Sequence, residues 1–163
     1  MTAEELTRRI VEVSERWPYL NHQALGHLRR RLRDMPDDAL FDGLIAVFTE
    51  PSSDAYAAQE YAGRLLEVMN PKPQAPLDDL LPRVLPSWNR SIEQLPAYLA
   101  RAFGRDAVLD ALERVDRASV VLPELTDTVR FWLRALPLSS AMSAQRSDPL
   151  GPLGQEQNEG KEG

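Results

Sequence analysis

Apolar residues recur at intervals of three and four along almost the whole chain, and this spacing constrains the fold more than any other feature. No stretch of four or more residues alternates apolar and polar side chains as a half-buried strand does. The first stripe contains Leu6, Ile10 and Val13 and ends before Pro18, which cannot continue a helix. We therefore predict an all-α fold.

The interruptions between stripes predict about eight short antiparallel helices. Their apolar stripes lie within residues 6–17, 25–35, 40–48, 58–69, 77–88, 92–103, 108–115 and 125–136. Asn21 is expected to cap the second helix, and Ser91 with Gln94 forms a capping-box pattern at the start of the sixth. Pro82 and Pro96 are expected to shorten or bend the helices that contain them.

Two segments are too rich in proline or polar residues to be helical. Residues 70–76 contain three prolines and are predicted to be the longest linker in the folded part. From Pro137 onward the chain is rich in Pro, Gly, Ser, Gln and Glu, and its apolar residues are isolated. Because 163 residues suit one domain, we predict a helical repeat domain over 1–136 and a disordered tail over 137–163.

An internal repeat is visible when the sequence is displaced by 37 residues. The superposed pairs are Leu44 and Leu81, Phe48 and Leu85, Tyr61 and Tyr98, and Leu66 and Phe103. The stretch LDDLLPRVLPSWNRSIEQLPAYLARAFGRDAVLDAL resembles HEAT-like helical repeats, with a proline-containing helix, a polar turn and a helix ending in Ala and Gly. Asn89 and Arg90 stand where that family has an Asp and Arg pair. The resemblance, over roughly 37–136, implies stacked helical hairpins; an irregular helical bundle also explains the stripes.

The residues that common catalytic and cofactor sites require are missing from the sequence. The chain has no cysteine, and its two histidines, His22 and His27, are five residues apart and diverge on a helix. The motifs of zinc proteases, P-loop proteins, dinucleotide-binding proteins and serine hydrolases do not occur. We therefore expect a non-enzymatic protein with no catalytic residue, no cofactor and no metal.

The net charge of −6 is concentrated in one part of the chain. Residues 1–36 carry +2, residues 37–79 carry −7, residues 80–136 carry +1 and the tail carries −2. Such a segment can attract a basic protein and speed its association, although the same groups could only keep a surface hydrated. The predicted partner-binding residues are Asp37, Asp38, Asp42, Glu50, Asp54, Glu60, Glu67, Asp78 and Asp79.

These features favour a protein-binding module, either an immunity or inhibitor protein that occludes a basic toxin or an adaptor in an assembly. The alternative is a HEAT-like nucleic-acid-binding protein or glycosylase-like enzyme that uses the arginines of 29–33 and a pocket near Trp88 or Trp132. A structural subunit that associates through Phe131 or Trp132 is a third reading. Because no apolar run reaches 18 residues and no signal peptide is present, we expect a cytoplasmic protein without a membrane partner.

Overall fold

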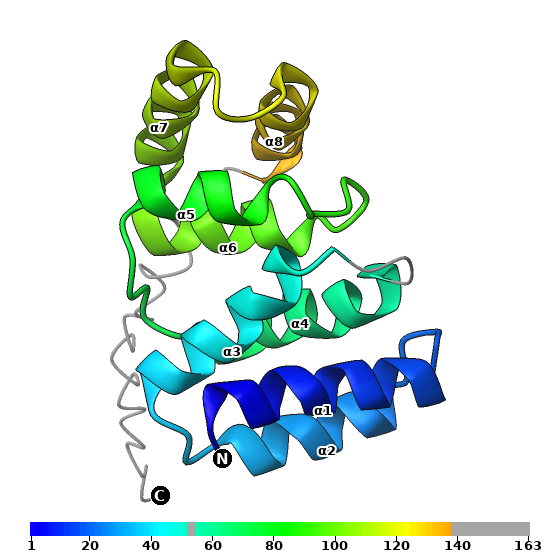
Figure 1. The fold of residues 1–163 in the computed structure, drawn as a ribbon. Helices are drawn as coiled ribbons and strands as arrows, with labels where there is room; N and C mark the ends of the chain where they lie inside the picture. Colours follow the sequence, from blue (N-terminus) through cyan, green and yellow to red (C-terminus); the bar gives the residue numbers. More distant parts are fainter. Residues whose placement is uncertain (52–54, 138–163) are drawn as a thin grey trace, which may run out of the picture.

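The computed structural model describes residues 1–51 and 55–137, and these residues form eight α-helices and no strand (Figure 1). The prediction of an all-α fold is confirmed. The predicted tail lies outside the described residues except for Pro137. The helices are α1 (Ala3–Arg16), α2 (His22–Leu32), α3 (Asp37–Thr49), α4 (Ala55–Met69), α5 (Leu77–Val84), α6 (Gln94–Phe103), α7 (Arg105–Ala118) and α8 (Pro123–Ala135).

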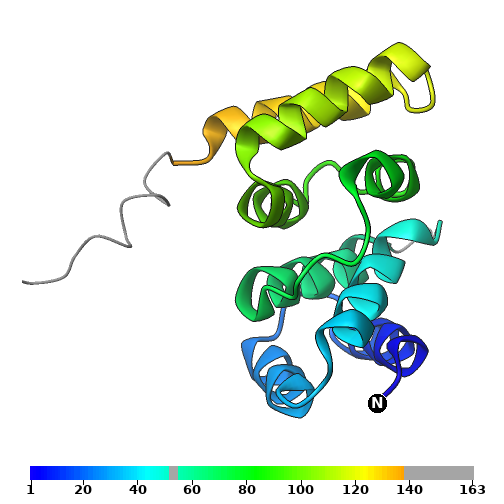
Figure 2. The same cartoon turned by 90° about the vertical axis from the view of Figure 1, so that its left-hand side faces the viewer.

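The helices are stacked in four pairs, with α1 and α2 at one end and α7 and α8 at the other (Figure 1). Each odd-numbered helix packs on the next odd-numbered helix, and each even-numbered helix packs on the next even-numbered one. We call these two sets the odd row and the even row; Figure 2 shows α1, α3 and α5 on one side and α2, α4 and α6 on the other. Stacked repeats pack in this way, while the HEAT-like resemblance itself stays a prediction.

The core is one apolar cluster that runs through all four pairs. The stripes seen in the sequence supply it: Leu6 and Ile10 of α1, Phe48 of α3 and Leu133 of α8 are all fully buried. Burying one such side chain contributes about 1.5–3 kcal/mol, and this burial holds together helices that are too short to be stable alone. The stack therefore depends on contacts between neighbouring pairs.

The displacement of 37 residues superposes two tyrosines, and these have equivalent positions in the stack. Tyr61 on α4 and Tyr98 on α6 are both fully buried. The Tyr61 hydroxyl accepts a hydrogen bond from the Asn21 backbone N–H at 2.9 Å, and the Tyr98 hydroxyl donates to the Pro71 carbonyl at 2.7 Å. Each hydroxyl thus ties an even-numbered helix to a connecting segment, α1–α2 for Tyr61 and α4–α5 for Tyr98.

The start of α6 differs from the prediction. The helix begins at Gln94, three residues after Ser91, and its N-cap residue Glu93 makes no side-chain capping bond. The predicted capping box is wrong because the preceding residues form a turn, in which the Trp88 indole N–H donates to the Ile92 carbonyl at 3.0 Å. Pro96 therefore lies in the first turn, where a proline removes no helical hydrogen bond and requires no bend.

Candidate functional site

The nine acidic residues predicted to bind a partner lie in several places. Five of them belong to the odd row: Asp37, Asp38 and Asp42 are exposed on α3, and Asp78 and Asp79 are exposed on α5. Glu50 is exposed directly after the last residue of α3. Glu60 and Glu67 are partly buried on α4, in the even row. Asp54 lies outside the described residues. The eight described residues are therefore divided between the two rows, and their role in binding a partner stays a prediction.

Four of the predicted carboxylates interact with nearby groups within the described residues. Asp38 accepts from the Ala39 backbone N–H at 2.7 Å. Asp78 on α5 accepts from Arg114 on α7, with 3.0 Å between Oδ1 and Nε. Glu67 pairs with Arg64 on the same helix at 3.4 Å. Asp37 accepts a long hydrogen bond of 3.4 Å from the backbone N–H of Lys72. Asp42 and Glu50, by contrast, line an open groove.

This groove lies between α1 and α3 and has a volume of about 470 Å³. Glu4 of α1, Asp42 of α3 and Glu50, the residue directly after α3, line it together, and we call it the acidic groove. Val11, which is 38% exposed, adds apolar surface between the carboxylates. The one cation in the lining, Arg8, pairs with Glu12 at 3.3 Å. The acidic groove therefore combines an apolar lining with an excess of negative charge.

A glycine sets the spacing of the two helices that form the acidic groove. A Cβ atom on Gly43 of α3 would lie 2.8 Å from the Ala3 carbonyl oxygen and 2.9 Å from Leu6 Cδ2. The Thr7 hydroxyl donates to the Gly43 carbonyl at 2.9 Å across the same contact. Backbone approach of this kind needs a residue without a side chain. Gly43 thus brings α1 close enough for Glu4 to reach the groove.

Charge differs between the two rows of helices. The helices of the odd row contain 13 acidic and 7 basic residues, whereas those of the even row contain 4 acidic and 7 basic residues. The helices of the odd row therefore carry a net charge of −6, and those of the even row carry +3. Surface charge separated in this way can orient an approaching partner.

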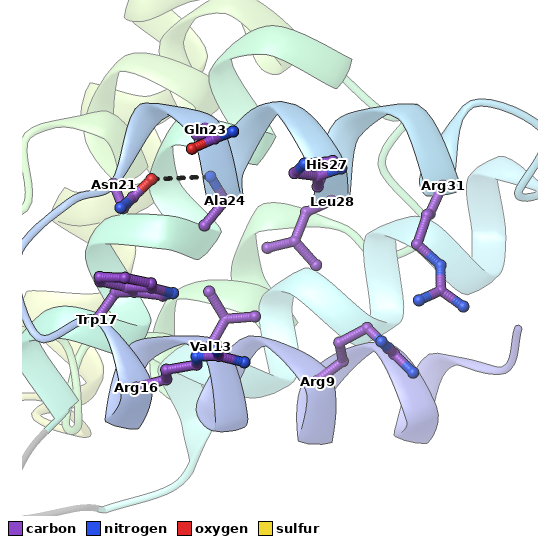
Figure 3. A pocket seen from close by; sticks show the side chains of 10 residues that line it. All are labelled: Arg9, Val13, Arg16, Trp17, Asn21, Gln23, Ala24, His27, Leu28 and Arg31. Atoms are coloured by element: carbon purple, nitrogen blue, oxygen red, sulfur yellow. Dashed lines mark hydrogen bonds between the residues drawn. The ribbon is translucent and has the colours of Figure 1, made fainter.

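The arginine run of α2 divides between two grooves. Arg31 points toward α1 across a groove between α1 and α2, and His27 also lines this groove (Figure 3). Arg29, Arg30 and Arg33 line a second groove of about 560 Å³, beside Val68 and Met69 of α4. The sequence shows a single basic cluster, but the helical rotation of about 100° per residue sends neighbouring side chains to different sides.

The two tryptophans considered as part of a pocket have structural contacts. Trp88 is 4% exposed, and its indole N–H is used in the turn before α6. The indole N–H of Trp132 donates to the Arg90 carbonyl at 2.8 Å, which ties α8 to the turn between α5 and α6. The neighbouring Phe131 is exposed and meets the Trp132 ring edge-on at 5.2 Å.

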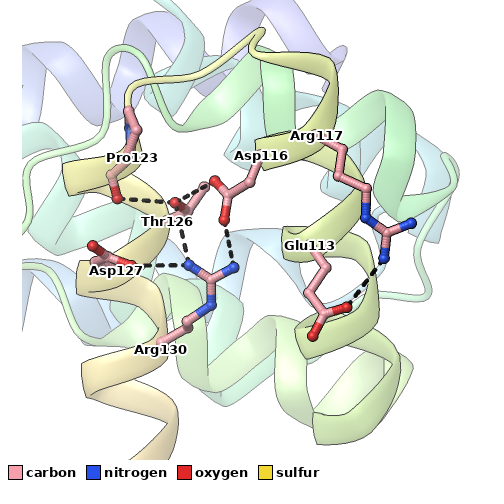
Figure 4. A network of polar contacts seen from close by, with 7 residues as sticks. All are labelled: Glu113, Asp116, Arg117, Pro123, Thr126, Asp127 and Arg130. Carbon is pink, nitrogen blue, oxygen red and sulfur yellow. Dashed lines mark hydrogen bonds and ion pairs between the residues drawn. The ribbon is translucent and has the colours of Figure 1, made fainter.

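A polar network joins α7 to α8 (Figure 4). Asp116 accepts from the Thr126 hydroxyl at 2.7 Å and from the Arg130 guanidinium at 2.5 Å, and Arg130 also pairs with Asp127 at 2.9 Å. Burial raises the pKa of Asp116, but the hydrogen bonds from Thr126 and Arg130 and the charge of Arg130 outweigh burial and lower it below its ordinary value. Because these groups are paired with one another, we interpret the network as a structural contact that holds α7 and α8 together.

Other kinds of site find little support in the described part of the chain. No three His, Asp or Glu side chains gather there as metal ligands, and none of its helices could span a bilayer. Comparisons with protein families, curated proteins and solved structures give no match for this chain. The arrangement of its own residues is therefore the basis for a functional proposal.

Proposed function

We propose that the chain is a protein-binding module that contacts a basic partner through exposed carboxylates at one end of its odd row, on α1 and α3. The observation that carries the proposal is the acidic groove, where Glu4, Asp42 and Glu50 surround an apolar lining. Asp38 extends the acidic side of α3 by one helical turn. An apolar centre with charges at its rim is the usual composition of a protein interface.

The charge of this surface favours particular kinds of partner. A basic protein would be steered toward the odd row, and complementary charge would raise its association rate. An immunity or inhibitor protein that covers a basic toxin would use such a surface, and so would an adaptor that holds a basic subunit. HEAT-like repeats would present it along a stack of helix pairs.

Affinity capture with matched variants tests this function. The purified chain, immobilised and exposed to a lysate of its own cells, should retain specific basic proteins that mass spectrometry identifies. The triple variant Glu4→Gln, Asp42→Asn and Glu50→Gln should lose them. The control variant Asp106→Asn, Asp110→Asn and Glu124→Gln removes the same charge from α7 and α8 and should keep them. Retention of no specific protein, or equal loss by both variants, would contradict the proposal.

The arginines between α2 and α4 support a second candidate function, the binding of nucleic acid. Arg29, Arg30 and Arg33 lie together along one groove and could contact successive phosphates. A gel shift with duplex DNA and with RNA at low salt tests this function. Binding should weaken as salt rises and should disappear in the triple Arg→Gln variant at these positions. Absence of a shift at low salt would exclude it.

A further inference from the structure

We propose that the groove between α1 and α2 is a docking site for a helical peptide that carries acidic side chains on both sides of an apolar stripe. This site goes beyond the proposed function because it lies on a different surface and recognises a partner of opposite charge. We call it the arginine groove, after Arg9 and Arg16 of α1 and Arg31 of α2, which line it (Figure 3).

The arginine groove is open because of how the first helix pair packs. Helix α1 packs mainly on α3 and α4, and α2 packs on α4, so the two helices make few contacts with each other. The space left between them has a volume of about 430 Å³. It lies at the end of the stack, where no further pair of described helices covers it (Figure 1). A third helix laid between α1 and α2 would fill this space.

The floor of the arginine groove is apolar. Val13 of α1 and Ala24 and Leu28 of α2 point toward one another across it (Figure 3). Trp17 closes one end, and its large side chain is 43% exposed. An exposed tryptophan beside aliphatic side chains is typical of the residues that dominate binding energy at interfaces. The floor therefore fits leucine-like side chains better than it fits nucleotide phosphates.

The rim of the groove is positively charged. Within residues 1–51 and 55–137, no ion pair involves Arg9, Arg16 or Arg31, and no acidic residue lines the groove. The Arg16 guanidinium lies 5.8 Å from the centre of the Trp17 ring, a cation–π contact that leaves its N–H groups able to bind a carboxylate. Three unpaired guanidinium groups around an apolar floor specify acidic residues beside an apolar stripe.

The shape of the groove selects a helix as the bound segment. Arg9 and Arg16 are two turns apart on α1, about 10 Å along the axis, and Arg31 lies on the facing helix. The backbone groups of α1 and α2 beside the groove are already used in their own helices, so an extended peptide could not pair with them. A helix satisfies its own backbone and needs only side-chain contacts.

Fluorescence anisotropy with a designed peptide tests the proposal on the full chain. The probe is a labelled helical peptide of about 16 residues with a leucine stripe flanked by glutamates. It should bind at low salt, and the triple variant Arg9→Gln, Arg16→Gln and Arg31→Gln should weaken binding by about tenfold or more. Trp17→Ala should also weaken it, since this change removes apolar contact without altering charge. Circular dichroism and thermal unfolding establish that each variant is folded.

Matched controls separate this site from general attraction between opposite charges. The variant Arg29→Gln, Arg30→Gln and Arg33→Gln removes the same charge from the other side of α2 and should change affinity by less than about threefold. A scrambled peptide with the same composition should bind weakly, because its leucines no longer share one face. Equal loss in both triple variants, equal binding of the scrambled peptide, or tighter binding of a single-stranded oligonucleotide at the same groove would overturn the proposal.

Discussion

Gln59 is a fully buried polar side chain whose amide is used at both ends. Its Nε2 donates to the Ser87 carbonyl at 2.7 Å, and its Oε1 accepts from the Asn89 N–H at 2.7 Å. Gln59→Leu should lower the free energy of unfolding by about 1–3 kcal/mol, because two partly buried backbone groups lose their partner. Urea unfolding measures this change. The exposed control Gln74→Leu should stay within about 0.5 kcal/mol of wild type; equal stability of both variants would contradict the role of Gln59.

The lowered pKa of Asp116 makes stability depend on pH. A carboxylate whose pKa is lower in the folded state stabilises the protein fully above its unfolded pKa, and this contribution is lost as pH falls through the folded pKa. Asp116→Asn should therefore lower the free energy of unfolding by about 1–3 kcal/mol at neutral pH and by less in acid. Urea unfolding at about pH 7 and pH 3 tests this expectation. A difference from wild type that does not shrink in acid would contradict it.

Between elements, glycines decide how closely helices approach. Gly43→Ala should destabilise the protein by about 1–3 kcal/mol, because the new Cβ would press on the backbone of Ala3 and on Leu6. Gly26 on α2 is the matched control, since a Cβ there would have nothing within 4 Å. Gly26→Ala should stabilise by about 0.5–1 kcal/mol, because alanine restricts the unfolded chain. Thermal unfolding compares the two; a shift of the same sign in both variants would be the contrary result.

Helix positions could be predicted from the sequence because apolar spacing and capping are local. Asn21 caps α2 as expected, with its Oδ1 accepting from the Ala24 N–H at 3.0 Å. Thr2 and Glu5 form a capping box at the start of α1, and their spacing of three residues is equally a local signal. The start of α6 could not be predicted in the same way, because contacts of Trp88 and Gln59 hold the preceding residues in a turn.

Over the whole molecule, the candidate surfaces depend on contacts that no local pattern reveals. Asp42 and Glu50 were predicted as binding residues, but Glu4 reaches them only because α1 packs on α3. In the sequence the excess of acidic residues lies in residues 37–79. In the folded chain these residues are divided, because α3 and α5 belong to the odd row and α4 belongs to the even row. Helix α1 consequently borders both the acidic groove and the arginine groove.

Helix α1 separates two grooves of opposite charge, and one paired titration tests this central claim most directly. An acidic amphipathic peptide and its lysine counterpart are titrated into wild type, into the Glu4, Asp42, Glu50 amide variant, and into the Arg9, Arg16, Arg31 glutamine variant. We predict that the amide variant loses only the lysine peptide and that the glutamine variant loses only the acidic peptide, each by about tenfold. If each variant weakened both peptides, or neither peptide bound, the two-groove account would be contradicted.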